Sequence, residues 1–284
     1  MTEQNQGKLN QLENTLPEGL LVDADWMERK GYSTSLRSQY VSAGWLVQPA
    51  RGTYKRPLGD LTWQKVVISL QTLLEQPLFV GGSTALELQG FGHYLKAEGA
   101  PATIHLYGDR PPPGWLAKLP LKETFKFHRS DTLFKSDPVT KGLSNLAWNV
   151  RTNTGTATDG LHGGDFRQLW EWGDWPLTLS SPERALLELL NELPGHESFH
   201  QVDKLVEGLR TLSPRKLQKL LADCRSIKVK RLFFWFAERH RHTWLKQLDR
   251  TAVDLGKGKR ELVKGGRLDP KYLITVPADL DAPL

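Results

Sequence analysis

The 284-residue sequence has a single cysteine, Cys224, and no apolar run long enough to cross a membrane. One cysteine excludes an internal disulfide and is typical of proteins in a reducing compartment. The longest apolar runs, such as LFFWFA at 232–237, fall far short of the roughly 18 residues that a membrane helix needs. The polar N-terminus also lacks the apolar stretch of a signal peptide. These absences predict a cytoplasmic protein, and the length favours two domains.

The sequence also lacks several motifs of catalysis and metal binding. No Gly-Lys-Ser or Gly-Lys-Thr triplet occurs, which excludes a Walker phosphate loop. HESFH at 196–200 matches the H-E-x-x-H pattern of zinc proteases, but Pro194 and Gly195 place it at the start of a helix and no third ligand follows. His240 and His242 make no better metal site. We therefore expect no metal and no cofactor.

The stretch FVGGSTALELQG at 79–90 raises the possibility of a nucleotidyltransferase, because such enzymes place a Gly-Gly-Ser turn between a strand and a helix. They also need two carboxylates, spaced Asp-x-Asp or Asp-x-Glu about ten residues later, to hold two Mg²⁺ ions. The matching span contains only Glu98, and the next aspartate, Asp109, is unpaired in a proline turn. We therefore predict no catalytic residue here, and interpret the stretch as a glycine turn followed by a helix with Ser83 as its N-cap.

The net charge of +6 is concentrated in one part of the chain. Residues 1–60 contain 7 Lys/Arg and 7 Asp/Glu, whereas residues 210–267 contain 17 Lys/Arg and 5 Asp/Glu. A local excess of this size favours a phosphate-bearing or acidic partner. The alternative is a basic surface that is simply solvated.

The first 58 residues have the order of elements of a winged helix-turn-helix. Two short helices precede STSLRSQYVSAGW at 33–45, in which Ser33 is a good N-cap, and WLVQPARGTYKRP at 45–57 then predicts a hairpin. Hydroxyl, amide and guanidinium groups on the exposed side of the third helix suit base edges, and wing cations suit phosphates. A protein-docking module without DNA contact is the alternative. The predicted DNA-binding residues are Thr34, Ser35, Arg37, Ser38 and Gln39 on the helix and Arg51, Thr53, Lys55 and Arg56 on the hairpin.

The remaining chain alternates predicted helices and strands and ends in a basic segment. In that segment glycines at 256, 258, 265 and 266 separate lysines and arginines, a pattern that lets backbone N–H groups and cations approach phosphate together. A plain basic turn has the same composition. The predicted basic C-terminal surface comprises Lys228, Lys230, Arg231, Lys257, Lys259, Arg260, Lys264 and Arg267.

Taken in order, these segments resemble the AbiEi family, the antitoxins of type IV toxin–antitoxin systems. The matching pieces are GYSTSLRSQYVSAGWLVQPARGTYKRP, VGGSTALELQGFGHYL, SPERALLELLNELP, CRSIKVKRLFFWFAERH and GKGKRELVKGG with YLITVP. The resemblance implies a repressor that binds inverted repeats in its own promoter and counteracts a nucleotidyltransferase toxin. It does not require a direct antitoxin–toxin complex, and monomers or weak dimers cooperating on DNA would suffice.

We accordingly predict an α+β protein with a winged helix-turn-helix at 1–58 and a larger mixed α/β domain at 59–284. The Gly-Gly-Ser stretch makes the second domain a candidate remnant of a nucleotidyltransferase-like fold without catalysis. Two other hypotheses stay open at this point. The second domain could act on nucleotides or nucleic acid as an enzyme, or the whole chain could be a docking protein that binds no DNA.

Overall fold

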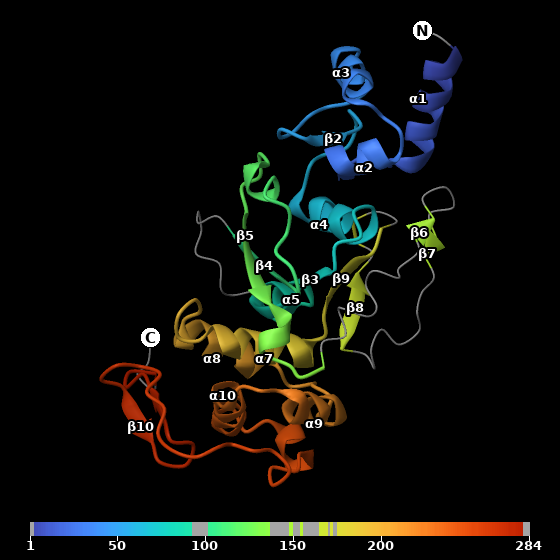
Figure 1. Ribbon diagram of the computed structural model, residues 1–284. Coiled ribbons are helices and arrows are strands. Elements are labelled where there is room, and N and C mark those ends of the chain that lie inside the picture. Colours follow the sequence, from blue (N-terminus) through green and yellow to red (C-terminus); the bar gives the residue numbers. More distant parts are fainter. Residues whose placement is uncertain are drawn as a thin grey trace.

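A five-stranded mixed sheet lies at the centre of the molecule, between an N-terminal helical module and a C-terminal lobe (Figure 1). The computed structural model describes residues 3–92, 102–136, 148–149, 154–155, 165–169, 171–172 and 175–280. The strand order is β5-β4-β3-β9-β8, in which β4 and β5 are parallel, β3 and β9 are parallel, and the other pairs are antiparallel. The strands are β3 (Leu78–Val80), β4 (Thr103–Gly108), β5 (Thr124–Arg129), β8 (Phe166–Leu169) and β9 (Leu177–Ser180).

Helices cover both sides of this sheet. Helix α4 (Trp63–Thr72) lies on the side of the N-terminal module, whereas α5 (Gly82–Leu88) and α7 (Pro182–Glu192) lie on the side of the C-terminal lobe (Figure 1). Ser181 caps α7 and Pro182 occupies its first turn, as the sequence predicts. Short elements complete the middle of the described chain: η1 (Leu116–Lys118), η2 (Ser130–Thr132), β6 (Trp148–Asn149) and β7 (Thr154–Gly155).

The N-terminal module contains the predicted order of helices. Asp23 and Ser33 cap α2 and α3 by accepting the backbone N–H of Trp26 and Leu36, so short polar side chains set both helix starts. Val47 bridges Lys55 in the predicted hairpin, and β2 also pairs with β1, a pairing that the sequence did not predict. The elements are α1 (Glu3–Thr15), β1 (Leu21–Asp23), α2 (Ala24–Arg29), α3 (Thr34–Ser42) and β2 (Thr53–Lys55).

Helix α4 connects the two halves of the molecule. The Ser69 hydroxyl of α4 accepts the backbone N–H of Leu21 at 2.9 Å, and Gln71 of the same helix donates to the carbonyl of Thr178 on β9. One helix therefore contacts both β1 and the central sheet, and the boundary after residue 58 stays a prediction.

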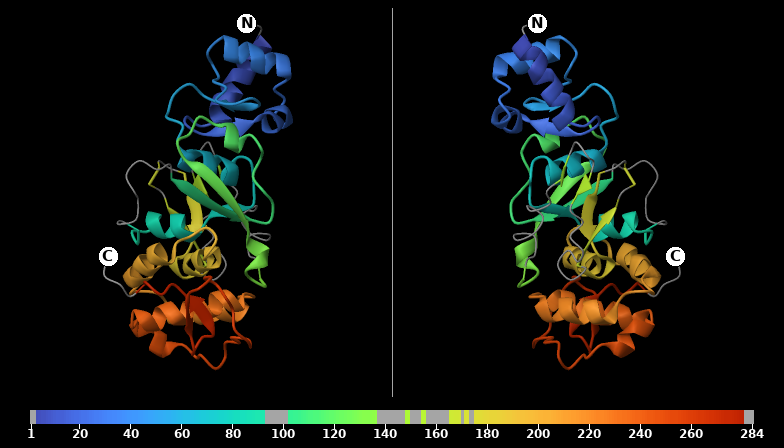
Figure 2. Two further views of the ribbon diagram at one scale, coloured as in Figure 1. Left: turned by 90° about the vertical axis from the view of Figure 1, so that its left-hand side faces the viewer. Right: turned by 90° about the vertical axis from the view of Figure 1, so that its right-hand side faces the viewer.

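The C-terminal lobe packs beneath α7 and is built around α10. The whole apolar run of α10, Leu232 to Ala237, is buried and forms the core of the lobe. The views in Figure 2 show the lobe and the N-terminal module at opposite ends of an elongated molecule. None of the described helices is long and apolar enough to span a membrane. The lobe contains α8 (Phe199–Gly208), α9 (Pro214–Asp223), α10 (Ile227–Arg239), η5 (Thr243–Gln247), β10 (Arg267–Asp269) and β11 (Ile274–Val276).

Candidate nucleic-acid interface

Helix α3 presents a polar, exposed side to solvent. Tyr40 is buried against the module core, whereas four predicted base-contacting side chains on the other side of the helix are exposed. Their hydroxyl and amide groups both donate and accept hydrogen bonds, which is the chemistry that base edges in the major groove require. These exposed residues are Thr34, Ser35, Ser38 and Gln39.

Arg37 does not belong to this exposed side, contrary to the prediction. Only 6% of it is accessible, and its guanidinium donates to the Ala24 carbonyl at 2.6 Å and to the Thr34 hydroxyl at 2.8 Å. The guanidinium also lies over the Tyr54 ring. Arg37 therefore fixes α3 to the start of α2 and to β2, and it is not available to a base.

The hairpin offers fewer cations than the sequence predicts. Arg51 is exposed at its tip, but Thr53 is buried and its hydroxyl bonds with the Ala50 backbone. Lys55 is also buried, and its ammonium donates to the carbonyls of residues 56, 57 and 58. Arg56 is half-buried and pairs with Glu18 at 2.9 Å. Of the four predicted wing residues, only Arg51 has the exposed position that a phosphate contact needs.

The basic C-terminal residues divide into a buried and an exposed group. Lys228 donates to the carbonyls of Asn191 and Leu193, and burial lowers its pKa. Lys230 is 6% accessible, and Arg231 is 2% accessible and donates to three carbonyls of the loop around residues 255–273. Lys228 and Arg231 thus bind backbone carbonyls of the protein, and none of these three cations has the exposed position that a phosphate contact needs.

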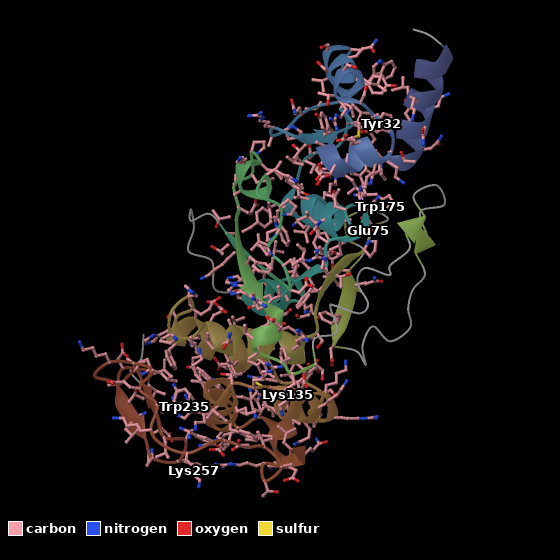
Figure 3. All side chains as sticks on the ribbon, viewed as in Figure 1. Tyr32, Glu75, Lys135, Trp175, Trp235 and Lys257 are labelled. Carbon is pink, nitrogen blue, oxygen red and sulfur yellow. The ribbon has the colours of Figure 1, made fainter. Side chains whose placement is uncertain are left out.

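The exposed group forms what we call the basic loop, residues 256–267. Five cations lie in this segment against one carboxylate, Glu261. Arg231 donates to the Gly258 carbonyl, and this bond anchors the backbone of the basic loop. The cations of the loop are exposed. Lys257 lies at the edge of the lobe, far from Tyr32 in the N-terminal module (Figure 3). The exposed cations of the basic loop are Lys257, Lys259, Arg260, Lys264 and Arg267.

The Gly-Gly-Ser turn lies between β3 and α5, and two of the chain's own carboxylates occupy it. The Gly82 backbone N–H donates to Glu188, and the Ser83 hydroxyl donates to Glu197 at 2.8 Å. The predicted Ser83 N-cap is wrong, because Gly81 is the N-cap residue and makes no side-chain cap bond. The donors that would face a phosphate in a nucleotidyltransferase are thus bonded internally, beneath helix α7.

The strands beside this turn carry aromatic residues where a nucleotidyltransferase needs carboxylates. His105 and Tyr107 alternate on β4, which follows α5 and pairs with β3, and His128 lies opposite Tyr107 on β5. The rings of Tyr107 and His128 stack with centroids 4.6 Å apart. The alternating pattern of APATIHLYG at 100–108 predicts this strand, which the structure has as β4.

The two histidines form a buried polar chain. His128 donates from Nδ1 to Glu192 at 3.0 Å, because the pKa of this carboxyl is lowered and an ionised carboxylate only accepts. In neutral His128, Nε2 is then the acceptor, and His105 donates to it from Nδ1 at 2.9 Å. Burial lowers the pKa of His105 to about 4, assisted by neighbouring positive groups. These bonds connect β4 and β5 to Glu192 of α7, and no metal-binding set comes together among the described residues.

Two models of known protein families match parts of the chain. A family described as "Transcriptional regulator, AbiEi antitoxin N-terminal domain" matches residues 5–97. A second, described as "Transcriptional regulator, AbiEi antitoxin, Type IV TA system", matches residues 166–277. The chain belongs to the AbiEi antitoxin family.

One solved structure shares the overall fold of this AbiEi antitoxin. The crystal structure of the RV2827C protein from Mycobacterium tuberculosis is similar with a TM-score of 0.55 at 14% identity, over 94% of this chain and 89% of that chain. No curated protein matches the sequence. The fold class and the family resemblance predicted from sequence are therefore confirmed, while the contacts of individual residues with DNA stay predictions.

Replacing Arg37 should destabilise the N-terminal module instead of changing base preference. The Arg37→Ala variant loses two hydrogen bonds from a buried charged group, so we expect a loss of about 2–3 kcal/mol in the free energy of unfolding. Urea unfolding followed by circular dichroism measures this loss. Arg29→Ala, which removes an exposed arginine from α2, is the matched control. Wild-type stability with altered base preference in Arg37→Ala would contradict the assignment.

Buried His105 should make the free energy of unfolding fall as the pH is lowered from 6.5 to 4. The folded state binds fewer protons than the unfolded state in this window because the pKa of His105 is lowered to about 4. One such proton changes the free energy of unfolding by up to about 1.4 kcal/mol per pH unit. Denaturant unfolding at several pH values should show a flatter profile for His105→Asn than for the wild type. His200, whose side chain is 41% accessible, supplies the control, since His200→Asn should keep the wild-type slope.

Proposed function

We propose that this AbiEi antitoxin is a DNA-binding repressor that autoregulates its own operon and counteracts a cognate nucleotidyltransferase toxin. The observation that supports the DNA-binding half is the exposed polar side of α3, together with the exposed Arg51 of the hairpin. In a winged helix-turn-helix the recognition helix, which would be α3 here, enters the major groove, and the wing contacts the phosphate backbone. Family membership as a transcriptional regulator supports the same conclusion.

The basic loop supplies a second contact with nucleic acid in this proposal. It lies at the other end of the molecule from α3, so it would meet a separate stretch of phosphates (Figures 1 and 3). These phosphates would belong either to the DNA that flanks a half-site or to a nucleic acid that the toxin also binds. Two copies on an inverted repeat would each place one α3 in a half-site, which permits cooperation on DNA without a dimer in solution.

An enzymatic function is less well supported. The internal bonds of the Gly-Gly-Ser turn to Glu188 and Glu197 leave its donors unavailable to a triphosphate. His105 and Tyr107 on β4 do not supply the acidic oxygen ligands that Mg²⁺ prefers. The proposal therefore assigns no reaction to the second domain.

Gel-shift titrations on the protein's own upstream DNA test the repressor half. Ser38→Ala/Gln39→Ala should reduce the preference for upstream over scrambled DNA by roughly ten- to a hundredfold, because base-edge contacts carry specificity. Lys257→Ala/Lys259→Ala/Arg260→Ala should instead weaken binding to both DNAs and make log K less steep in log salt by about 2 to 3.

Two exposed lysines outside the basic loop supply the control for charge. Lys204→Ala/Lys246→Ala removes two cations from the same lobe and should leave the salt slope unchanged. The repressor proposal fails if upstream DNA binds no better than scrambled DNA. It also fails if neither set of variants changes binding.

Co-expression tests the antitoxin half separately. The chain should restore growth to cells that express a nucleotidyltransferase encoded beside it, and the Ser38→Ala/Gln39→Ala variant from the same inducible promoter should restore growth equally. Rescue by this variant is expected because α3 serves repression and the toxin is counteracted by the rest of the chain. Growth arrest that persists with stable wild-type protein would contradict the antitoxin role.

A further inference from the structure

A cationic cavity lies in the C-terminal lobe, apart from both α3 and the basic loop. It has a volume of about 310 Å³ and opens where the C-terminal ends of α8 and α10 meet. This volume is at the lower end of the range for small-molecule sites, about 300 to 1,000 Å³. The lining residues are Glu207, Arg210, His240, Arg241, His242 and Thr243.

Arg241 lies on this cavity in a backbone conformation that arginine rarely adopts. Its φ is +52°, in the left-handed region, at the position directly after the C-cap of α10. The end of α10 is a Schellman turn, in which the Arg241 N–H donates to Glu238 O and the His242 N–H donates to Ala237 O. Glycine is the usual residue at this position because it adopts a positive φ without strain. The chain instead keeps a long cationic side chain there.

Two histidines of the HRH sequence, His240 and His242, line the cavity, and hydrogen bonds fix the position of both rings. His242 is buried, donates from Nε2 to the Val206 carbonyl at 2.8 Å and stacks on Trp244. Burial lowers the pKa of His242, so this ring is neutral at physiological pH. His240 bonds through Nε2 to Asp203 at 2.7 Å, which fixes its ring at the cavity wall.

The two arginines of the cavity have no carboxylate partner among the described residues. Asp203, the nearest buried acid to this wall, pairs with Arg239 and His240. Glu207 is the only carboxylate on the lining, and the structure shows no ion pair from it to Arg210 or Arg241. Both arginines are exposed at the rim. A solute entering the cavity thus meets two guanidinium groups that protein carboxylates do not neutralise.

We propose that this cavity binds a phosphate group, with Arg210 and Arg241 as its two guanidinium ligands. Phosphate matches the planar fork of arginine through paired, charge-assisted hydrogen bonds. The phosphate belongs either to a free nucleotide or to the 5′ end of a nucleic acid strand, because both present the same group. The site is independent of the proposed DNA contacts of α3.

Isothermal titration of the full chain with inorganic phosphate, ADP and a 5′-phosphorylated RNA oligonucleotide tests the proposal. Arg210→Ala and Arg241→Ala should each weaken the binding of the phosphate-bearing ligands at least tenfold. Glu207→Gln should strengthen it, because this change removes the only carboxylate of the lining. Arg215→Ala, which removes an exposed arginine from α9, should leave binding unchanged.

Arg241→Gly separates binding from folding. Glycine relieves the left-handed strain, so this variant should melt at a higher temperature than the wild type while losing phosphate binding. Equal binding of ADP and the oligonucleotide supports a nucleotide site. The basic loop can bind an oligonucleotide with or without a 5′ phosphate, so a strand end is supported only if the 5′ phosphate tightens binding and both arginine variants abolish that gain. No phosphate binding, binding that survives both arginine variants, or equal binding of citrate would overturn the proposal.

Discussion

The buried carboxylate of Glu188 is the constraint on which the second domain depends. It bonds Arg184 at 2.8 Å, the Ser180 hydroxyl and the Gly82 N–H, so one side chain of α7 joins a helix, a strand end and the Gly-Gly-Ser turn. A buried charge is tolerated only when its partners satisfy it. Arg184 meets this condition while packing against the rings of Phe79, Phe134 and Phe166. The same contacts that stabilise the sheet also fill the turn that would otherwise face a phosphate.

Buried cations also need partners, and several lysines and arginines of this chain have theirs within the protein. Four cations are largely or partly buried, and each donates hydrogen bonds to backbone carbonyl oxygens that would otherwise lack a partner. They are Arg37, Lys55, Lys228 and Arg231. A count of lysines and arginines therefore overstates the charge that a nucleic acid can meet. Among the cations predicted to contact nucleic acid, the exposed ones are Arg51 at the hairpin tip and the five of the basic loop.

Sequence patterns within a few residues predict where several helices of the fold begin. Asp23, Ser33 and Ser181 were predictable as caps because the bond that each accepts comes from a residue three positions away. Arg37 was not predictable in this way, since its partner is the carbonyl of Ala24, across the turn between two helices. Ser83 is not the cap because α5 begins one residue earlier, at Gly82, and its hydroxyl donates instead to Glu197, which comes from a segment 114 residues away. Long-range partners decide which polar residues remain available for function.

The separation of polar sites along the molecule has a thermodynamic consequence. Helix α4, the central sheet and α7 separate the exposed side of α3 from the C-terminal lobe, which contains both the cationic cavity and the basic loop (Figure 2). Perturbations at sites that share no partners add in free energy, whereas residues within one network couple. Changes on α3 should therefore combine additively with changes in the basic loop, unless one nucleic acid bridges both. Arg37 and Thr34 should couple even without DNA, because they share a hydrogen bond.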